Sequence, residues 1–491
     1  MERIRRVFAW ICVCVLVVST LPLYAISFFN HPYYDDFGFS AGVHHAWKDT
    51  GSLTAVLKAA VEGMVNIYRT WQGNYTVNLI TNLQPGVFSE DLYWIANMLL
   101  LTLVIGCMLS FFLTVFGKLG MKKPDRWCLA SLAVTLLVQF MPDVGEAFYW
   151  FNGGIGTVAH HAVIALCAAW CVKLIGTNGP GIGRTLLLAL FAVLIPGGSY
   201  CGGLLTMCLL VCLLMWLFWR RHAKRWHFAL LTVLYGAFLL VSMAAPGNSL
   251  RADMIGYEVS PVKTILQSLY QGVGLIGSYI RLPVIAVTLL LLPAILEAAK
   301  QSPFRFEHPW LVLGLMAALF CTQLAPPLYS IASIGSGRQI NSYYLAFLAG
   351  WFLYVYYLAG FFVRKCPELP VLTPRRFGAL ALVCICLLGI GCLGFKRSSD
   401  VLYGIQNMSG PSALLSMLTG EAQQYDREMK AREELLNDET QPEITLKALT
   451  VNPAVFMQDQ LKVGAIYDVR PSLKLYYGKE AIHLEGEGEA P

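Results

Sequence analysis

Long apolar runs with few charged residues dominate the sequence and restrict its fold more than any other feature. Charged residues make up 13% of the chain and apolar residues 56%, whereas soluble domains carry roughly 25% charged residues. A helix satisfies its backbone hydrogen bonds within one run, and about 20 residues cross a hydrocarbon core. The sequence therefore predicts an all-α polytopic membrane protein with about eleven transmembrane helices. The predicted spans are 7–29, 92–116, 127–142, 155–175, 184–196, 199–219, 227–245, 282–299, 310–328, 341–363 and 377–395.

For two stretches of the chain, the sequence allows more than one arrangement relative to the membrane. The spans 184–196 and 199–219 are separated by Pro196-Gly197-Gly198, which is compatible with a helical hairpin or with one broken helix. The stretch 264–281 is apolar but contains two glutamines and several glycines. It is expected to be an interfacial or packed helix that leads into the next span.

The distribution of basic residues predicts the orientation of the chain. If the N-terminus is cytoplasmic, nineteen lysines and arginines fall on the cytoplasmic side and nine fall in the outer loops, with the C-terminal tail left out of the count. Such an excess on the inner side is typical of membrane proteins. The expected location is the cell (plasma or inner) membrane, with an extracytoplasmic C-terminus. Because the net charge of +6 is spread over short loops, the lipid bilayer is the expected partner and nucleic acid is not.

The pattern divides the chain into a transmembrane domain, 1–395, and an extracytoplasmic C-terminal segment, 396–491. The transmembrane domain carries a large first outer loop, 30–91. The C-terminal segment mixes helical periodicity with the alternation typical of strands, so a small α/β unit is expected. Its predicted elements are a helix over 412–437 and strands over 444–449 and 473–477.

Two adjacent carboxylates, Asp35 and Asp36, follow the outer end of the first predicted span. A carboxylate at this place can act as a general base on a sugar hydroxyl, or it can bind a metal ion. No cofactor is certain, but a divalent cation at Asp35/Asp36 is one interpretation. The alternative is a solvated loop that only ends the helix.

Short motifs accompany the acidic pair over most of the chain. They are Tyr34–Phe37, Trp71–Asn74, Phe148–Gly154, Ala245–Arg251, Gly337–Arg338, Asp468–Ser472 and Tyr476–Gly478. Together they resemble the GT-C superfamily of polytopic membrane glycosyltransferases, and in particular a bacterial, uncharacterised GT-C-like subgroup. Members of this superfamily take a sugar from a polyprenyl-phosphate donor at the extracytoplasmic surface. The resemblance implies that Asp35 and Asp36 are the catalytic residues, which deprotonate or orient the acceptor hydroxyl, with Asp35 as the base and Asp36 as its neighbour or a metal contact.

The chain departs from the subgroup at two positions. Asn74 stands where such proteins tend to have an arginine, and Gly156-Thr157 stands where a tyrosine is often found. These changes affect the expected contacts to donor or acceptor more than the catalytic carboxylate.

A lipid-phosphate donor requires fixed positive charge near the outer headgroups, and arginine can bind phosphate through two parallel hydrogen bonds. Arg251 and Arg338 follow turn-rich outer segments, so they are candidates for the donor phosphate site, together with Asn248. The alternative is that both arginines extend to lipid headgroups.

A sugar acceptor stacks on aromatic rings and forms hydrogen bonds with amides and carboxylates. The candidates for acceptor or sugar binding lie on the outer side, where an interfacial aromatic belt is the alternative explanation. They are Trp71, Glu146, Tyr149, Trp150 and Asn152.

These features predict a membrane glycosyltransferase that transfers a sugar from a polyprenyl-phosphate donor to a cell-envelope glycan or lipid. The chain lacks a G-x-x-x-x-G-K-[ST] motif, which disfavours a direct nucleotide-sugar donor. The alternatives are a transporter or flippase of a lipid-linked saccharide and a non-catalytic envelope scaffold. A transporter is expected to carry charged residues through its span interiors, and these spans carry few.

Overall fold

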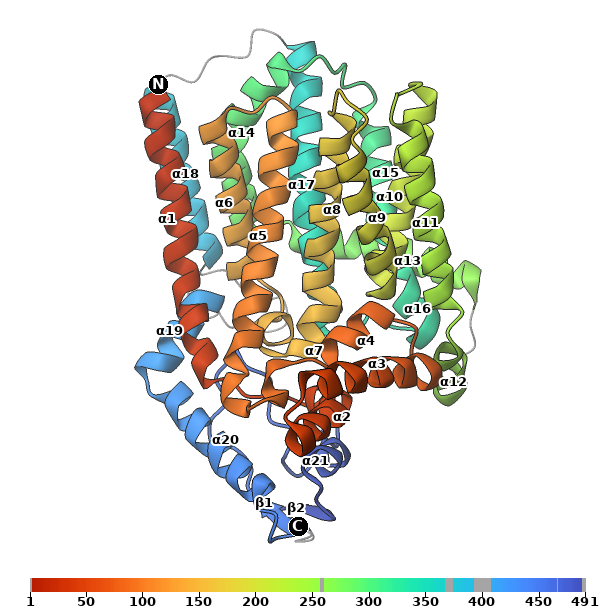
Figure 1. The fold of residues 1–491 in the computed structure, drawn as a ribbon. Coiled ribbons are helices and arrows are strands. Elements are labelled where there is room, and N and C mark those ends of the chain that lie inside the picture. The colour runs from red at the N-terminus through yellow and green to blue at the C-terminus, as the bar shows by residue number, and fades with distance from the viewer. Residues whose placement is uncertain (1, 257–259, 367–373, 393–407, 466, 488–491) are drawn as a thin grey trace.

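The computed structural model describes residues 2–256, 260–366, 374–392, 408–465 and 467–487, without the side chains of 374–377 and 391–392. The described chain is a helical bundle with only one pair of strands. The N-terminus lies at one end of the bundle, and the C-terminal segment lies beyond the opposite end (Figure 1). The all-α class predicted from the sequence is confirmed.

Eight helical segments of the described chain are long and apolar enough to cross a membrane. They match eight of the eleven predicted spans, so the protein is a multi-pass membrane protein by length and composition. Their main helices are α1 (Glu2–Ile26), α5 (Trp94–Lys118), α8 (His160–Ile175), α10 (Tyr200–Trp219), α11 (Arg225–Met243), α14 (Leu282–Gln301), α15 (Pro309–Thr322) and α17 (Gly337–Lys365).

The other three predicted spans are helices of the same bundle but do not reach that length or apolar character. The helices α6 (Lys123–Gln139) and α9 (Ile182–Leu194) have 17 and 13 residues, and the apolar part of α18 (Pro374–Cys392) is Gly378–Ile390. All three lie alongside longer helices in Figure 1. The count of eleven spans therefore stays a prediction.

The break at Pro196 forms a hairpin. Helix α9 ends in a tight turn, Ile195–Gly197, and α10 runs back along the bundle (Figure 1). The Nε2 atom of His160 lies 2.9 Å from the Ile195 carbonyl oxygen, and the ring fills the space beside Gly198. The stretch 264–281 belongs to α13 (Pro261–Tyr279), which packs against α15 and α16 (Ala325–Ile331), as a packed helix was expected to do.

The first outer loop folds into three helices, α2 (Asp35–Thr50), α3 (Leu53–Thr70) and α4 (Tyr75–Thr81). Helix α3 lies across the end of the bundle rather than along it (Figure 1). Its side chains Leu53, Leu57 and Val61 are exposed and four residues apart, so they form one apolar stripe. An amphipathic helix of this kind lies naturally in a membrane interface.

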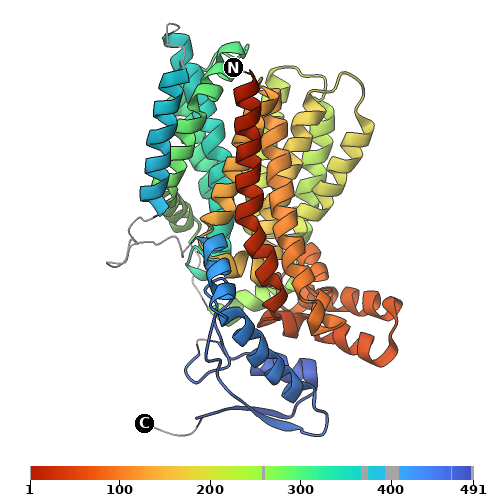
Figure 2. The same cartoon turned by 90° about the vertical axis from the view of Figure 1, so that its left-hand side faces the viewer.

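The described part of the C-terminal segment, from residue 408 on, starts beside α1 and extends below the bundle (Figure 2). The helix predicted over 412–437 is two helices, because Gly420 takes a φ of +81° between them. The strand predicted over 444–449 is shorter and pairs in parallel with a second strand. The elements are α19 (Ser409–Leu418), α20 (Glu421–Asn437), β1 (Glu443–Leu446), α21 (Arg470–Tyr477) and β2 (Ala481–Leu484).

The strand predicted over 473–477 is wrong, because these residues form the second half of α21. Pro471 lies in the first turn of that helix, Gly478 ends it at a φ of +72°, and the buried Leu473 and Tyr476 are three residues apart. Proline near the start and glycine just past the end are typical helix boundaries. The short run is too brief for period 2 and period 3.6 to be told apart.

The C-terminal segment shares a core with the first outer loop. Phe37 and Ala41 of α2 are buried in one cluster with Leu473 and Tyr476 of α21 and with apolar residues of both strands. The two outer regions therefore pack as one body on the end of the bundle. This body positions the start of α2, where the acidic pair lies.

Candidate functional site

The acidic pair occupies the first turn of α2, but its two carboxylates have different surroundings. The residue before the pair, Tyr34, has a φ of +44°, which is unfavourable for a tyrosine. Backbone strain of this kind is often found at functional sites. Asp35 lines a large cavity, whereas Asp36 is 1% exposed and points into the protein.

Asp36 is held by three hydrogen-bond donors. The Tyr93 hydroxyl and the Tyr33 backbone N–H donate to Oδ2, and the Asn152 backbone N–H donates to Oδ1 at 3.0 Å. Burial raises the pKa of Asp36 to about 7, although these bonds oppose the shift. The expectation that Asp36 acts on substrate is therefore corrected: no face of its carboxylate is open, and it holds Tyr33 and Asn152 in place.

We predict that Asp36→Ala lowers the free energy of unfolding by about 3 kcal/mol. The reason is that each buried donor left without an acceptor costs roughly 1–3 kcal/mol. Thermal or denaturant unfolding of the protein in detergent measures the loss. Asp49→Ala, at the exposed end of the same helix, is the control and should change stability by less than about 0.5 kcal/mol. Equal stability of the two variants would contradict a positioning role for Asp36.

The cavity that Asp35 lines has a volume of about 1410 Å³. It is lined by residues of the first outer loop, of the helical bundle and of the C-terminal segment. Among the residues predicted from sequence, it is lined by Asp35, Trp71, Glu146, Trp150, Asn152, Asn248, Arg251 and Arg338. Asp36 and Tyr149 are the two predicted residues that do not line it.

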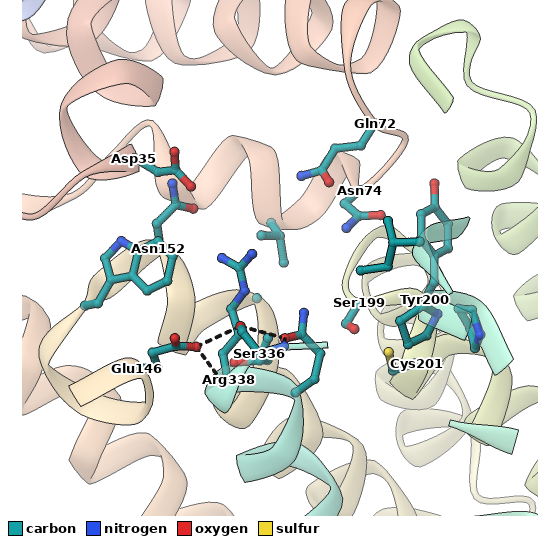
Figure 3. Close-up of a pocket in the computed structure, with 18 of the residues that line it drawn as sticks. Asp35, Gln72, Asn74, Glu146, Asn152, Ser199, Tyr200, Cys201, Ser336 and Arg338 are labelled. Carbon is teal, nitrogen blue, oxygen red and sulfur yellow. Dashed lines mark hydrogen bonds between the residues drawn. The ribbon is translucent and has the colours of Figure 1, made fainter. Parts of the chain in front are cut away.

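Arg338 projects its guanidinium into the cavity, toward the side where Asp35 and Asn152 lie (Figure 3). The guanidinium carbon lies 4.9 Å from the centre of the Trp150 ring, and Nε is buried without a hydrogen bond. The Arg338 backbone N–H donates to Glu146, which also accepts from the Ser336 hydroxyl at 3.0 Å. Glu146 thus anchors the start of α17 and leaves the Arg338 side chain free.

Arg251 reaches the cavity from α12 (Pro246–Ile255). Its guanidinium carbon lies 4.8 Å from the centre of the Trp71 ring, and one nitrogen donates to Gln72 Oε1 at 3.2 Å. Within the described residues, no carboxylate oxygen lies within 4 Å of the guanidinium nitrogens of Arg251 or Arg338. Burial lowers the pKa of Arg251, and the positive charge of Arg338 lowers it further. The two arginines therefore create a site that favours an anion.

Asn248 lines the cavity but has no free polar atom in its amide. Its Oδ1 accepts from the Gly73 N–H at 3.2 Å and from the Tyr200 hydroxyl at 3.0 Å, and its Nδ2 donates to two carbonyl groups of α11. The expectation that it binds phosphate is therefore corrected. Asn248 fixes the Trp71–Asn74 turn against α12.

Two glycines allow that contact. A side chain on Gly73 would overlap the Ser242 carbonyl oxygen, and one on Gly247 would overlap the backbone of Trp71. The Trp71–Asn74 and Ala245–Arg251 motifs thus form one packed unit that presents Trp71 and Arg251 together.

Several polar atoms around the cavity lack a hydrogen-bond partner in the described chain. They are Asn74 Oδ1, Trp150 Nε1, Asn152 Nδ2 and Arg338 Nε. Buried polar atoms are normally paired, so these groups suit a polar ligand. Asn74 and the Gly156-Thr157 pair, which depart from the subgroup pattern, both lie on the cavity wall.

Tyr149 is 1% exposed, and its hydroxyl donates to the Leu23 carbonyl oxygen at 2.8 Å. It cannot stack on a sugar, because the π-helical turn Gly145–Tyr149 places it behind the cavity wall. The expected sugar contact at Tyr149 is corrected to a packing role.

Sequence reasoning missed three groups of residues at the site. Tyr93 holds Asp36 from 57 positions away, Gln72 holds Arg251, and a C-terminal strip over 454–460 lines the cavity. Tyr33 joins this strip, because its hydroxyl donates to the Gln458 carbonyl oxygen at 3.0 Å. No local pattern marks the strip, since it is a loop without periodicity.

Within the described residues, Asp35 and Asp36 are not grouped with other side chains that could bind a metal ion. Asp36 is engaged by its three donors, and the neighbouring His44 and His45 contact the carbonyl oxygens of Val87 and Tyr476. In the part of the chain that the structure describes, the grouping of potential metal ligands lies elsewhere.

Comparison with known protein families, curated proteins and solved structures gives no match. The chemistry of the cavity is therefore inferred from its own residues.

Proposed function

We propose that this protein is a membrane glycosyltransferase that transfers a sugar from a polyprenyl-phosphate donor to a glycan or lipid of the cell envelope. The observation that carries the proposal is that one cavity is lined by the carboxylate of Asp35 and by two arginines, Arg251 and Arg338, whose guanidinium groups form no ion pair with the described residues. Both arginines lie more than 200 positions after Asp35 in the sequence.

In the proposed reaction, Asp35 accepts the proton of an acceptor hydroxyl as its oxygen attacks the anomeric carbon. The bond between that carbon and the phosphate oxygen breaks, and its electron pair leaves with the phosphate. Arg338 and Arg251 stabilise the charge on the phosphate, which is where fixed donors contribute most to catalysis. Trp150 and Asn152 lie beside Asp35 and offer an aromatic ring and a free amide to the sugar.

The cavity also has an apolar side suited to a prenyl chain. Met243, Ile255 and Ile265 line the cavity and are exposed at the same time, so they connect it to the lipid-facing surface. Small-molecule pockets usually have volumes of roughly 300–1,000 Å³. A volume of about 1410 Å³ leaves room for a donor headgroup and an acceptor together.

The proposal places the cavity on the extracytoplasmic side of the plasma or inner membrane. The cavity lies at the end of the bundle that carries the C-terminal segment, opposite the N-terminus (Figure 1). The excess of basic residues on the N-terminal side of the spans supports a cytoplasmic N-terminus.

The experiment that tests this function is transfer from a panel of radiolabelled polyprenyl-phosphate sugars in membranes that contain the protein. We expect at least one donor to yield labelled glycan or lipid, with the Asp35→Asn variant as the blank. A flippase would instead move lipid-linked sugar across vesicles without forming a new glycosidic bond. Movement without product in every donor would overturn the proposal in favour of transport.

The rate of transfer should depend on pH through Asp35. Burial raises the pKa of Asp35 to about 6, although the charges of Arg338 and Arg251 oppose the shift. A base acts when deprotonated, so kcat/KM should fall about tenfold per pH unit below pH 6 and level off above it. Kinetics between pH 5 and pH 8 measure the profile.

Tyr34 and Asp36 also lie near Asp35, so a variant is needed to identify which group titrates. Arg338→Gln removes a charge that lowers the pKa of Asp35, so the acid limb should move to higher pH. A rate that is constant from pH 5 to pH 7 would contradict a base with this pKa.

A further inference from the structure

A second group of polar side chains lies where the C-terminal segment meets the first outer loop, outside the cavity described above. His31 follows α1, Glu90 begins the turn Glu90–Leu92 before α5, and Glu433 lies on α20. A ring nitrogen of His31 and one carboxylate oxygen from each glutamate lie within 4.8 Å of one another. Three separate segments of the chain therefore bring one imidazole and two carboxylates together.

His31 is 6% exposed and has one ring nitrogen in use. Its Nε2 lies 3.0 Å from Asp426 Oδ1, and its Nδ1 is buried without a hydrogen bond in the described chain. A buried polar atom without a partner costs free energy, so an unpaired Nδ1 needs an explanation. A histidine that binds a metal through one nitrogen commonly bonds to a carboxylate through the other.

The two glutamates also lack a cationic partner. In the described residues, neither Glu90 nor Glu433 forms an ion pair with lysine or arginine. The nearby Lys430 bonds to Asp426 at 3.1 Å, and Arg432 bonds to Asp459 at 2.8 Å. Two close, partly buried carboxylates without a counter-ion repel each other unless a cation or a proton joins them.

There is space for a small ion beside the two glutamates. A cavity of about 50 Å³ is lined by Glu90 and Glu433, and by Tyr477, whose hydroxyl donates to Glu90, whereas His31 does not line it. This volume accommodates one ion with a water molecule.

We propose that His31 Nδ1 and the carboxylates of Glu90 and Glu433 bind one divalent transition-metal ion, with Zn²⁺ preferred. One imidazole nitrogen with two carboxylate oxygens is a ligand set that Zn²⁺ accepts, and a water can complete four-fold coordination. The ion would join Glu433 of α20 to His31, which lies four residues before Asp35 in the sequence. The site is separate from the sugar-transfer proposal and does not depend on it.

The test uses the full chain purified in detergent, treated with a chelator and then incubated with Zn²⁺. After removal of excess metal, elemental analysis should give about one Zn²⁺ per chain. Glu433→Gln should lower the affinity for Zn²⁺ at least tenfold, whereas Glu434→Gln, its exposed neighbour on α20, should leave it unchanged. Asp426→Asn should weaken binding about 10–100-fold, because the carboxylate orients the imidazole.

Folding is checked through the thermal midpoint of each variant with and without Zn²⁺. Zn²⁺ should raise the midpoint of the wild type and of Glu434→Gln, and should leave that of Glu433→Gln unchanged. Equal Zn²⁺ content in the wild type and in Glu433→Gln would overturn the site. Saturation by Mg²⁺ or Ca²⁺ without binding of Zn²⁺ would overturn the assignment to a transition metal.

Discussion

The Asp35→Asn variant is expected to lose about 10²–10⁴-fold in the rate of sugar transfer, which is the usual contribution of a general base. Asparagine keeps the size of the side chain but cannot accept the proton at neutral pH. No hydrogen bond within the described residues reaches the Asp35 carboxylate, so the substitution leaves no protein donor unpaired. Thermal stability and donor binding should therefore stay close to those of the wild type. Single-turnover transfer with a fixed donor concentration measures the rate.

Asp49→Asn, at the far end of α2, is the matched control, because it removes an exposed carboxylate from the same helix. It should transfer sugar at the rate of the wild type. Full transfer activity in Asp35→Asn would remove the basis for a base at this position. A loss of activity accompanied by a large fall in the unfolding midpoint would indicate a structural role instead.

The Arg338→Ala variant is expected to lose about 10²–10³-fold in turnover, as is typical when one preorganised donor to a developing charge is removed. It should also bind the donor more weakly, because the phosphate is charged in the ground state as well as in the transition state. The Arg338 guanidinium stands free over the Trp150 ring, so its loss removes cavity contacts while the Glu146 bond to the backbone remains. Transfer kinetics and equilibrium donor binding measure the two effects.

Arg281→Ala is the control for charge at the outer end of a span. Arg281 is exposed, bonds to the Ser278 carbonyl oxygen at 3.1 Å and does not line the cavity, so its loss should leave donor binding unchanged. Arg338→Lys should recover only part of the activity, because lysine keeps the charge but not the planar fork. Equal donor binding in Arg338→Ala and Arg281→Ala would contradict a phosphate site at Arg338.

That the protein is a helical membrane protein follows from the sequence alone, because a long run of apolar residues by itself indicates a membrane span. Residues 92–116, for example, contain no charged residue. The helix α5 could be predicted from this run without information about any other segment. The same logic fails for short elements. The run 473–477 is helical and packs Leu473 and Tyr476 against α2, and a five-residue pattern by itself does not distinguish a helix from a strand.

Some residues of the cavity could also be selected from the sequence, because they belong to short motifs at the outer ends of apolar runs. Asp35, Arg251 and Arg338 could be selected on that ground, and the structure brings them to one cavity. Their roles remain proposals, as do the count of eleven spans and the resemblance to the GT-C superfamily.

Only the tertiary structure separates Asp35 from Asp36, because adjacent residues on a helix point in different directions and the sequence does not say which side is filled. Tyr93 and Asn152, distant in the chain, close the side of Asp36 and leave that of Asp35 open. The same is true of the strip over 454–460 and of the His31, Glu90 and Glu433 group. Each depends on contacts between residues that lie from 57 to 425 positions apart, which the apolar pattern of a single segment does not contain.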